Sequence, residues 1–218
     1  MLRRIKAVAG AERGFPTRRA VGQGCAMRVY LAGPDVFLPD PVARGAALKA
    51  VCARHGLTGV FPLDDLADEP ADWSGLPEWQ RIARRNEAHI AGCAALIANL
   101  TPFRGPSADV GTVFELGYAR ALGRKVFGWS GSAENFAERT RRTHGHACDT
   151  AGVWRDGEGL ELESFGCCDN LMIDGAIAAS GGRLETEALP PARRWTDLVA
   201  FERCVAAAAA CLRRSAGE

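Results

Sequence analysis

The chain has 218 residues, of which 47% are hydrophobic and 24% are charged, and its formal net charge is +1. This length accommodates one well-buried domain, and the near-neutral charge gives no electrostatic reason to expect a nucleic acid or membrane partner. No apolar run approaches the roughly 18 residues of a membrane span, and the N-terminus lacks the apolar core of a signal peptide, so we expect a cytoplasmic protein.

Residues 1–26 are basic and rich in Gly, without sustained periodicity, and we expect a disordered extension there. An Arg-rich leader is also typical of organelle transit peptides. Met27 stands directly before the first strand-like run, however, and this favours a start codon assigned too early. Residues 27–218 are expected to form a single α/β domain.

Short apolar runs alternate with helical stretches along the chain. The expected strands are 28–32, 57–61, 94–100 and 125–129, and the expected helices are 42–55, 78–92, one ending at 123, about 134–142, 169–179 and 195–213. The run 94–100 is apolar almost throughout, which is typical of a strand buried on both faces of a parallel sheet. The stretch 149–166 is predicted as a loop or hairpin. The alternation predicts a flavodoxin-like or Rossmann-like doubly wound sheet, mainly parallel, of about five strands with helices on both faces.

Polar residues gather where three of these strands end. In an open parallel sheet, ligands bind beyond the carboxyl ends of the strands, and the stretches 30–37, 64–77 and 101–115 arrive at that edge. The side chains expected to converge there are Tyr30, Asp35, Glu87, Asp109 and Glu115. The long acidic loop 64–77 is expected to form part of the pocket wall, together with Trp73 and Trp79, and these rings either stack on a ligand or simply anchor the loop.

Glu115 is a lone carboxylate among small and apolar neighbours, in a helix that follows a loop rich in Gly and Pro. Apolar surroundings limit its solvation while the positive end of the helix dipole favours its charged form, and this combination suits a nucleophile. The alternative is a buried Glu in an ordinary hydrogen-bonded pair. The loop also resembles a phosphate cradle, but it has no Lys, and Asp109 would repel a phosphate. Converging carboxylates favour a neutral, oxygen-rich ligand.

Eight cysteines are scattered along the chain without CxxC pairs. In a reducing compartment such residues are usually small buried hydrophobes. A metal site can be drawn from His144, His146, Cys148, Cys167 and Cys168. Because their spacing fits no standard zinc pattern, we expect neither a metal nor a cofactor.

Four stretches stand in order between residues 27 and 179: 30–37 (YLAGPDVF), 98–102 (ANLTP), 109–119 (DVGTVFELGYA) and 169–172 (DNLM). Together they resemble the nucleoside 2-deoxyribosyltransferase family. The resemblance implies an enzyme of nucleoside salvage that transfers 2-deoxyribose from a donor deoxyribonucleoside to a free nucleobase acceptor. It also implies a covalent glycosyl-enzyme intermediate, with retention at C1′ and ping-pong kinetics.

The resemblance also implies roles for four residues at the reacting centre. Glu115 matches the family nucleophile, and Tyr30 matches a tyrosine whose hydroxyl orients it. Asp109 and Glu87 match acidic positions that hold the substrate and serve protonation of the leaving base. Glu87 departs from the Asp found in some members of the family.

Other matched positions are expected to bind substrate. Gly33 and Asp35 lie in the first matched stretch. Asn170 and Met172 match residues that complete a neighbouring subunit's site, so the resemblance implies a homo-oligomer, either a dimer or a hexamer. The pair Cys167–Cys168, directly before the last matched stretch, has no place in the family pattern.

Two other functions fit the same residues. A related N-glycosidase would use Glu115 in the same way but let water resolve the intermediate, hydrolysing a 2-deoxynucleoside or its 5′-monophosphate. A non-catalytic nucleoside or nucleotide sensor would need the pocket but not the nucleophile.

Overall fold

The computed structural model describes residues 27–216, so the extension expected over residues 1–26 lies outside the described residues. Its main sheet has five parallel strands in the order β2-β1-β3-β4-β7. The strands are β1 (Met27–Ala32), β2 (Leu57–Val60), β3 (Ala95–Asn99), β4 (Lys125–Ser130) and β7 (Leu184–Thr186). This is the strand order of a flavodoxin-like doubly wound sheet, in which the direction of winding reverses between β1 and β3. The predicted fold class is confirmed.

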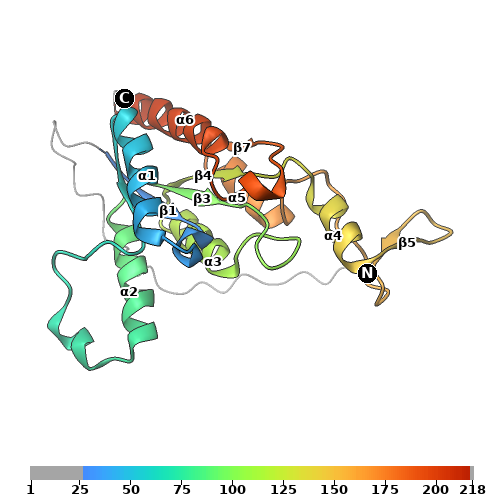
Figure 1. Ribbon diagram of the computed structural model, residues 1–218, viewed down its shortest axis with the longest axis horizontal. Helices are drawn as coiled ribbons and strands as arrows, with labels where there is room; N and C mark the ends of the chain where they lie inside the picture. The colour runs from blue at the N-terminus through green and yellow to red at the C-terminus, as the bar shows by residue number, and fades with distance from the viewer. Residues whose placement is uncertain (1–26, 217–218) are drawn as a thin grey trace, which may run out of the picture.

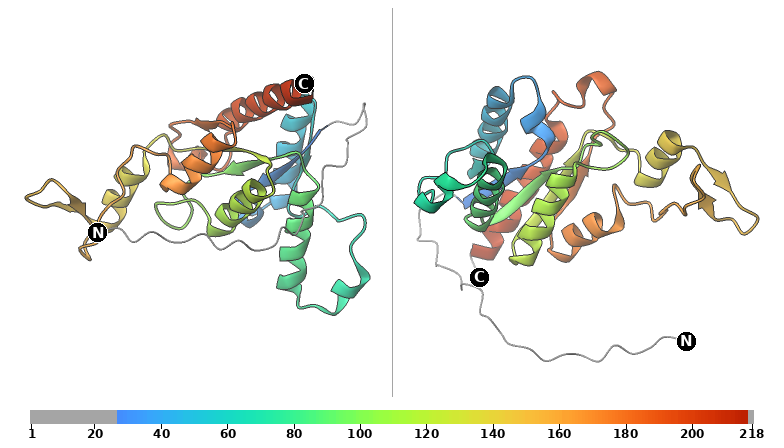
Figure 2. Two further views of the ribbon diagram at one scale, coloured as in Figure 1. Left: turned by 180° about the vertical axis from the view of Figure 1, so that it is seen from behind. Right: turned by 90° about the horizontal axis from the view of Figure 1, so that it is seen from below.

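Helices cover both faces of the sheet (Figures 1 and 2). They are α1 (Pro41–Arg54), α2 (Glu78–Ala91), α3 (Val110–Ala121), α4 (Phe136–His144), α5 (Leu171–Ala179) and α6 (Val199–Ala216), with short 3-10 helices η1 (Pro34–Phe37), η2 (Ala71–Gly75) and η3 (Pro191–Arg193). Among residues 27–216, no helix is both long enough and apolar enough to span a membrane.

Two hydrophobic clusters fill the space between the sheet and its helices. Successive strand residues point to opposite faces, so Val29 joins the cluster under α1 and α6, and Tyr30 joins the cluster under α2, α3 and α5. All five residues of β3 are buried, as expected for a central strand of a parallel sheet. Tyr30 and Ala32, which β1 sends into the cluster with α3, therefore lie in a dry environment.

Local sequence signals explain where the helices begin and end. The Asp40 side chain accepts a hydrogen bond from the Ala43 amide at 2.9 Å and so caps α1. Gly56, predicted as the residue that stops this helix, has a φ of +77° and is in the left-handed region. Asp109 caps α3 in the same way as Asp40 caps α1.

The structure differs from the sequence-based prediction in three places. The edge strand β7 was not identified, because three residues are too few to show a period of two. The last helix begins at Val199 rather than 195, after η3 and a turn. A hairpin forms, as one of the two alternatives for 149–166 predicted, but its first strand lies before that stretch: β5 (Ala147–Cys148) pairs antiparallel with β6 (Trp154–Arg155). With α4, this hairpin extends away from the sheet (Figures 1 and 2).

Candidate active site

Glu115 lies on α3, five residues after the helix begins at Val110. Its Oε1 accepts a hydrogen bond from the Tyr30 hydroxyl at 2.8 Å and another from Asn86 Nδ2 at 3.1 Å. Tyr30 comes from β1 and Asn86 from α2, so three elements on one face of the sheet meet at this carboxylate. Within residues 27–216, no side chain or amide donates a hydrogen bond to Oε2. One oxygen is therefore held in place, and the other remains free to react.

Burial raises the pKa of the Glu115 carboxyl to about 7. The charge of Asp109 acts in the same direction on this pKa, whereas the hydrogen bonds from Tyr30 and Asn86 lower it. The helix dipole acts mainly within the first turn, and Glu115 lies beyond that turn. Loss of solvation therefore outweighs the stabilising groups, and the carboxyl gains and loses its proton near neutral pH.

The Tyr30 hydroxyl remains a donor to Glu115. The side chain is fully buried, and this burial, together with the neighbouring Glu115 charge, raises the pKa of the phenol far above its ordinary value. A phenol with so high a pKa stays protonated at any physiological pH. Tyr30 therefore fixes the orientation of Glu115 without competing for its proton.

Asp109 combines a structural contact with a free acceptor. Its Oδ2 accepts hydrogen bonds from the amide and the hydroxyl of Thr112, at 2.9 Å and 3.0 Å. No hydrogen bond to Oδ1 is present in the part of the chain that the structure describes. Asp109 lies near enough to Glu115 for its charge to raise the pKa of that carboxyl. The structure thus brings Tyr30, Asp109 and Glu115 together.

At α2 the structure presents Asn86 to Glu115, and not Glu87. Consecutive helical residues point about 100° apart, so the two side chains leave α2 in different directions. Glu87 makes no side-chain hydrogen bond or ion pair within residues 27–216. Asn86 was not among the residues predicted for this site, because acidic residues were given preference there. Its spacing of four residues from the buried Ile90 was the available signal that it faces inward.

Asp35 is buried beneath the edge of the sheet and is fully engaged. Its Oδ1 pairs with Arg44 Nε at 2.7 Å, and its Oδ2 accepts a hydrogen bond from Asn99 Nδ2 at 2.8 Å. A Cβ atom on Gly33 would lie 2.7 Å from the Asn99 Cβ and 2.6 Å from Asp35 Oδ2. Gly33 is therefore needed for the close approach of β1 and β3. Asp35 stabilises this approach through its hydrogen bond with Asn99 and its ion pair with Arg44.

The two residues expected at a neighbouring subunit's site lie at the start of α5. Asn170 caps this helix by accepting a hydrogen bond from the Met172 amide at 3.0 Å, and its Nδ2 donates to Glu163 Oε2 at 2.6 Å. The Met172 side chain is 71% exposed. Neither residue contacts Glu115 within the chain.

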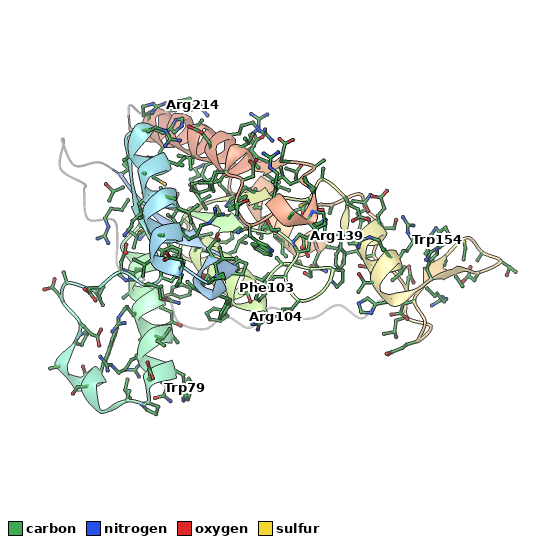
Figure 3. The ribbon with its side chains drawn as sticks, in the orientation of Figure 1. Trp79, Phe103, Arg104, Arg139, Trp154 and Arg214 are labelled. Atoms are coloured by element: carbon green, nitrogen blue, oxygen red, sulfur yellow. The ribbon has the colours of Figure 1, made fainter. Side chains whose placement is uncertain are left out.

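A hollow of about 300 Å³ opens at the same edge of the sheet, between the segments that follow β1 and β3. It is lined by Pro34, Phe37, Leu38, Pro102, Phe103, Arg104 and Trp195. The Phe37 and Phe103 rings are stacked with centroids 5.5 Å apart, and the Arg104 guanidinium lies 4.6 Å from the Phe103 centroid. Trp79, by contrast, is 68% exposed and lies well away from Phe103 and Arg104 (Figure 3).

Metal-binding groups do not gather anywhere in residues 27–216: no three His, Cys, Asp or Glu side chains are grouped so that they could hold an ion. This applies to the His and Cys residues from which a metal site was drawn on the sequence. His146 instead packs against Trp154, with ring centroids 5.2 Å apart.

Comparison with known proteins gives a consistent set of relatives. The family model described as nucleoside 2-deoxyribosyltransferase matches residues 29–172. An uncharacterised protein of Schizosaccharomyces pombe is 32% identical over 165 residues, which cover 71% of this chain and 78% of the relative. A 2-deoxyribosyltransferase from Leishmania mexicana has a similar structure, with a TM-score of 0.52 and 28% identity, and the match covers 70% of this chain and 95% of that one.

Glu115→Gln tests whether the buried carboxylate opposes folding. Glutamine keeps an acceptor for Tyr30 and Asn86 but cannot ionise. Because the folded-state pKa lies above the ordinary value of 4.5, the folded state binds more protons than the unfolded state, and stability falls as the pH rises to about 7. We expect the variant to be more stable than the wild type at pH 8, by on the order of 1–3 kcal/mol, with a smaller difference at pH 5.

Urea unfolding of both proteins at the two pH values measures this difference in the free energy of unfolding. A variant less stable than the wild type at pH 8 would contradict the expectation. It would make Glu115 an ordinary structural hydrogen-bonding residue.

Proposed function

Because the chain belongs to the nucleoside 2-deoxyribosyltransferase family, we propose that it transfers 2-deoxyribose from a deoxyribonucleoside to a free nucleobase in nucleoside salvage. The observation that carries this proposal is the state of Glu115. One of its oxygens is held by two neutral donors, the other is free, and its pKa is near neutrality. A carboxylate held in this way is suited to attack an electrophilic carbon.

In the proposed first half-reaction, Glu115 Oε2 attacks C1′ of the donor through an oxocarbenium-like transition state. A bond forms between Oε2 and C1′ while the bond from C1′ to the base nitrogen breaks, and its electron pair leaves with the base. Nitrogen of a second base then attacks C1′ from the opposite side and releases Glu115. Two inversions give net retention at C1′.

The leaving base gains a proton and the acceptor base loses its N–H proton. We assign both transfers to Asp109, which relays protons between the bases and solvent water. Asp109 Oδ1 accepts no hydrogen bond from residues 27–216, and Asp109 lies near enough to Glu115 to raise its pKa, which supports a contact with either the sugar hydroxyl or the base. Glu87 remains a proposed acidic contributor on the strength of the family resemblance. We assign Asn86, which donates a hydrogen bond to Glu115, as a second residue that positions the nucleophile.

We assign the nucleobase to the aromatic hollow beside Phe37 and Phe103. Stacked rings favour a planar, apolar face, and the hollow lies beyond β1 and β3, where the winding of the sheet reverses. This location supports the segment after Thr101, rather than the loop that carries Trp73, as the wall of the base site. Gly33, with no side chain, leaves room beside this wall for the sugar.

We further propose that the active protein is a homo-oligomer, a dimer or a hexamer, in which Asn170 and Met172 reach a neighbouring site. The exposed Met172 side chain supports this assignment, because it faces away from its own core. A cytoplasmic location is proposed as well. The cysteines among residues 27–216 are all free thiols, as is usual in a reducing compartment.

The proposed transfer predicts a specific pair of products. Incubation of the protein with deoxyinosine and adenine should yield deoxyadenosine and hypoxanthine. Glu115→Ala should lower this rate by at least about a thousandfold and should form no covalent adduct, because the nucleophile is absent. Product analysis and intact-mass measurement check both statements.

The same incubation separates the alternatives. Deoxyribose and hypoxanthine as the only products would make the protein an N-glycosidase. Binding of deoxyinosine with neither turnover nor adduct in the wild type would make it a sensor.

The raised pKa of Glu115 predicts how the rate depends on pH. Since the ionised carboxylate attacks, kcat/KM should rise with pH and level off above about 7. Tyr30→Phe removes a donor that favours the charged form, so the rise should move to higher pH by about one unit. Asp109→Asn should lower kcat/KM at every pH, because proton transfer to the leaving base is lost. Since it also removes a repelling charge, the rise in its remaining activity should move to lower pH. Shifts of both variants in the same direction would contradict this account of the Glu115 pKa.

Substitutions of aromatic residues test where the nucleobase binds. Phe103→Ala should raise KM about tenfold for the acceptor base and for the donor nucleoside, because the leaving and the incoming base occupy the same site in turn, while adduct formation at saturating donor should be much less affected. Trp79→Ala is the matched control, since it removes an exposed aromatic ring from the competing wall. Steady-state kinetics with adenine as the varied acceptor measure both variants. A raised KM in the Trp79 variant alone would move the base site to the 64–77 loop.

A further inference from the structure

A buried ion pair lies outside the reacting centre, between α4 and the start of α5. Arg139 is 1% exposed and Asp169 is 0% exposed, and Arg139 Nη2 lies 3.2 Å from Asp169 Oδ2. Figure 3 shows Arg139 where α4 meets the rest of the molecule. Removing two charges from water is costly, so such a pair persists only when further hydrogen bonds satisfy both partners.

Arg139 satisfies its remaining donors with backbone carbonyls from three separate segments. Nε donates to the Pro106 carbonyl at 2.6 Å, Nη2 to the Cys168 carbonyl at 2.6 Å, and Nη1 to the Glu134 carbonyl. The planar guanidinium holds these acceptors in one fixed arrangement, which a lysine ammonium does not reproduce. The loop after β3, the start of α4 and the segment before α5 are thereby joined.

Asp169 holds the next two residues of the same loop. Its Oδ1 accepts from the Ser107 hydroxyl at 2.5 Å, and its Oδ2 accepts from the Ala108 amide at 2.9 Å. The Asn170 amide also donates to Oδ1, at 2.8 Å. Three consecutive loop residues, 106–108, are thus bound to one ion pair, and the residue that follows them is Asp109.

We propose that Arg139 and Asp169 are positioning residues that lock the 106–108 loop and the start of α5 into one unit. This unit fixes Asp109 where it caps α3 and faces Glu115. The kinetic part of this inference rests on the proposed function. The geometric part does not, because the position of Asp109 is reported by the titration of Glu115 without any substrate.

The groups that face Glu115 are Tyr30 from β1, Asn86 from α2 and Asp109 at the start of its own helix. If the loop loosens, Asp109 moves away and Glu115 becomes better solvated. Both changes favour the charged carboxylate. A purely structural ion pair would change stability but would leave the titration of Glu115 in the folded protein where it was.

Ser107→Ala is the sharpest test, because it removes one hydrogen bond to Asp169 without uncovering the buried charges. We expect the Glu115 titration, followed by carbon-13 NMR of the labelled side chain, to move to lower pH. We also expect kcat/KM for deoxyinosine to fall about tenfold, with the same downward shift of its pH profile. Glu115→Gln assigns the NMR signal.

Thr140→Ala is the matched control. It deletes a half-buried hydroxyl from the same helix as Arg139, but this hydroxyl bonds only to the Phe136 carbonyl, at 2.8 Å. It should keep the wild-type titration and kinetics. Asp169→Asn should show the Ser107→Ala effects more strongly, and where it fails to fold, the Ser107 variant decides.

An unchanged Glu115 titration in Ser107→Ala would overturn the inference. The ion pair between Arg139 and Asp169 would then contribute to stability alone. A wild type that turns over no substrate would refute the proposed function only. The NMR comparison would still decide the positioning role in that case.

Discussion

The hydrogen bond from Tyr30 to Glu115 is the contact on which the candidate site depends. It joins the central strand β1 to the helix that follows β3, across the point where the winding of the sheet reverses. Because the Tyr30 ring is fully buried, its hydroxyl has no freedom to turn away, and it holds one carboxylate oxygen of Glu115 in a fixed place. The fold thus sets the orientation of the Glu115 carboxylate.

The same arrangement explains why the pKa of Glu115 is raised. Neutral donors from Tyr30 and Asn86 orient the carboxylate. Their hydrogen bonds stabilise its charge less than the loss of solvation destabilises it, so its pKa rises toward neutrality. An arginine in place of Asn86 would give Glu115 a stable ion pair and a weaker nucleophile. Charge neutralisation is instead used deeper in the fold, where Arg44 pairs with Asp35.

A polar chain stiffens the edge of the sheet beneath the site. Asp35 receives a hydrogen bond from Asn99, the Asn99 side chain accepts one from the Thr101 amide, and the Thr101 hydroxyl accepts one from the Gly131 amide. These contacts tie together the segments that follow β1, β3 and β4. Glu115 therefore sits on a helix packed against this sheet, while the aromatic hollow is built from the connecting segments, where shape varies more easily.

The sequence by itself determined the fold class, four of the five strands of the sheet and the six long helices. Almost continuous apolar runs such as 94–100 predict buried parallel strands, because this signal acts over a few neighbouring residues. Four ordered motifs also indicated the family to which the chain belongs. The isolation of Glu115 among apolar residues already indicated a perturbed carboxylate.

Only the tertiary structure decided which neighbours Glu115 has. Asn86 and Glu87 are adjacent in sequence, and a helix turn of about 100° between them selects the amide for this contact. The sequence predicts Asp35 at the ligand edge of the sheet, and only the structure shows that Arg44 and Asn99 contact its two oxygens. Such contacts join residues far apart in the chain. They depend on strand order and helix rotation, which no local pattern encodes.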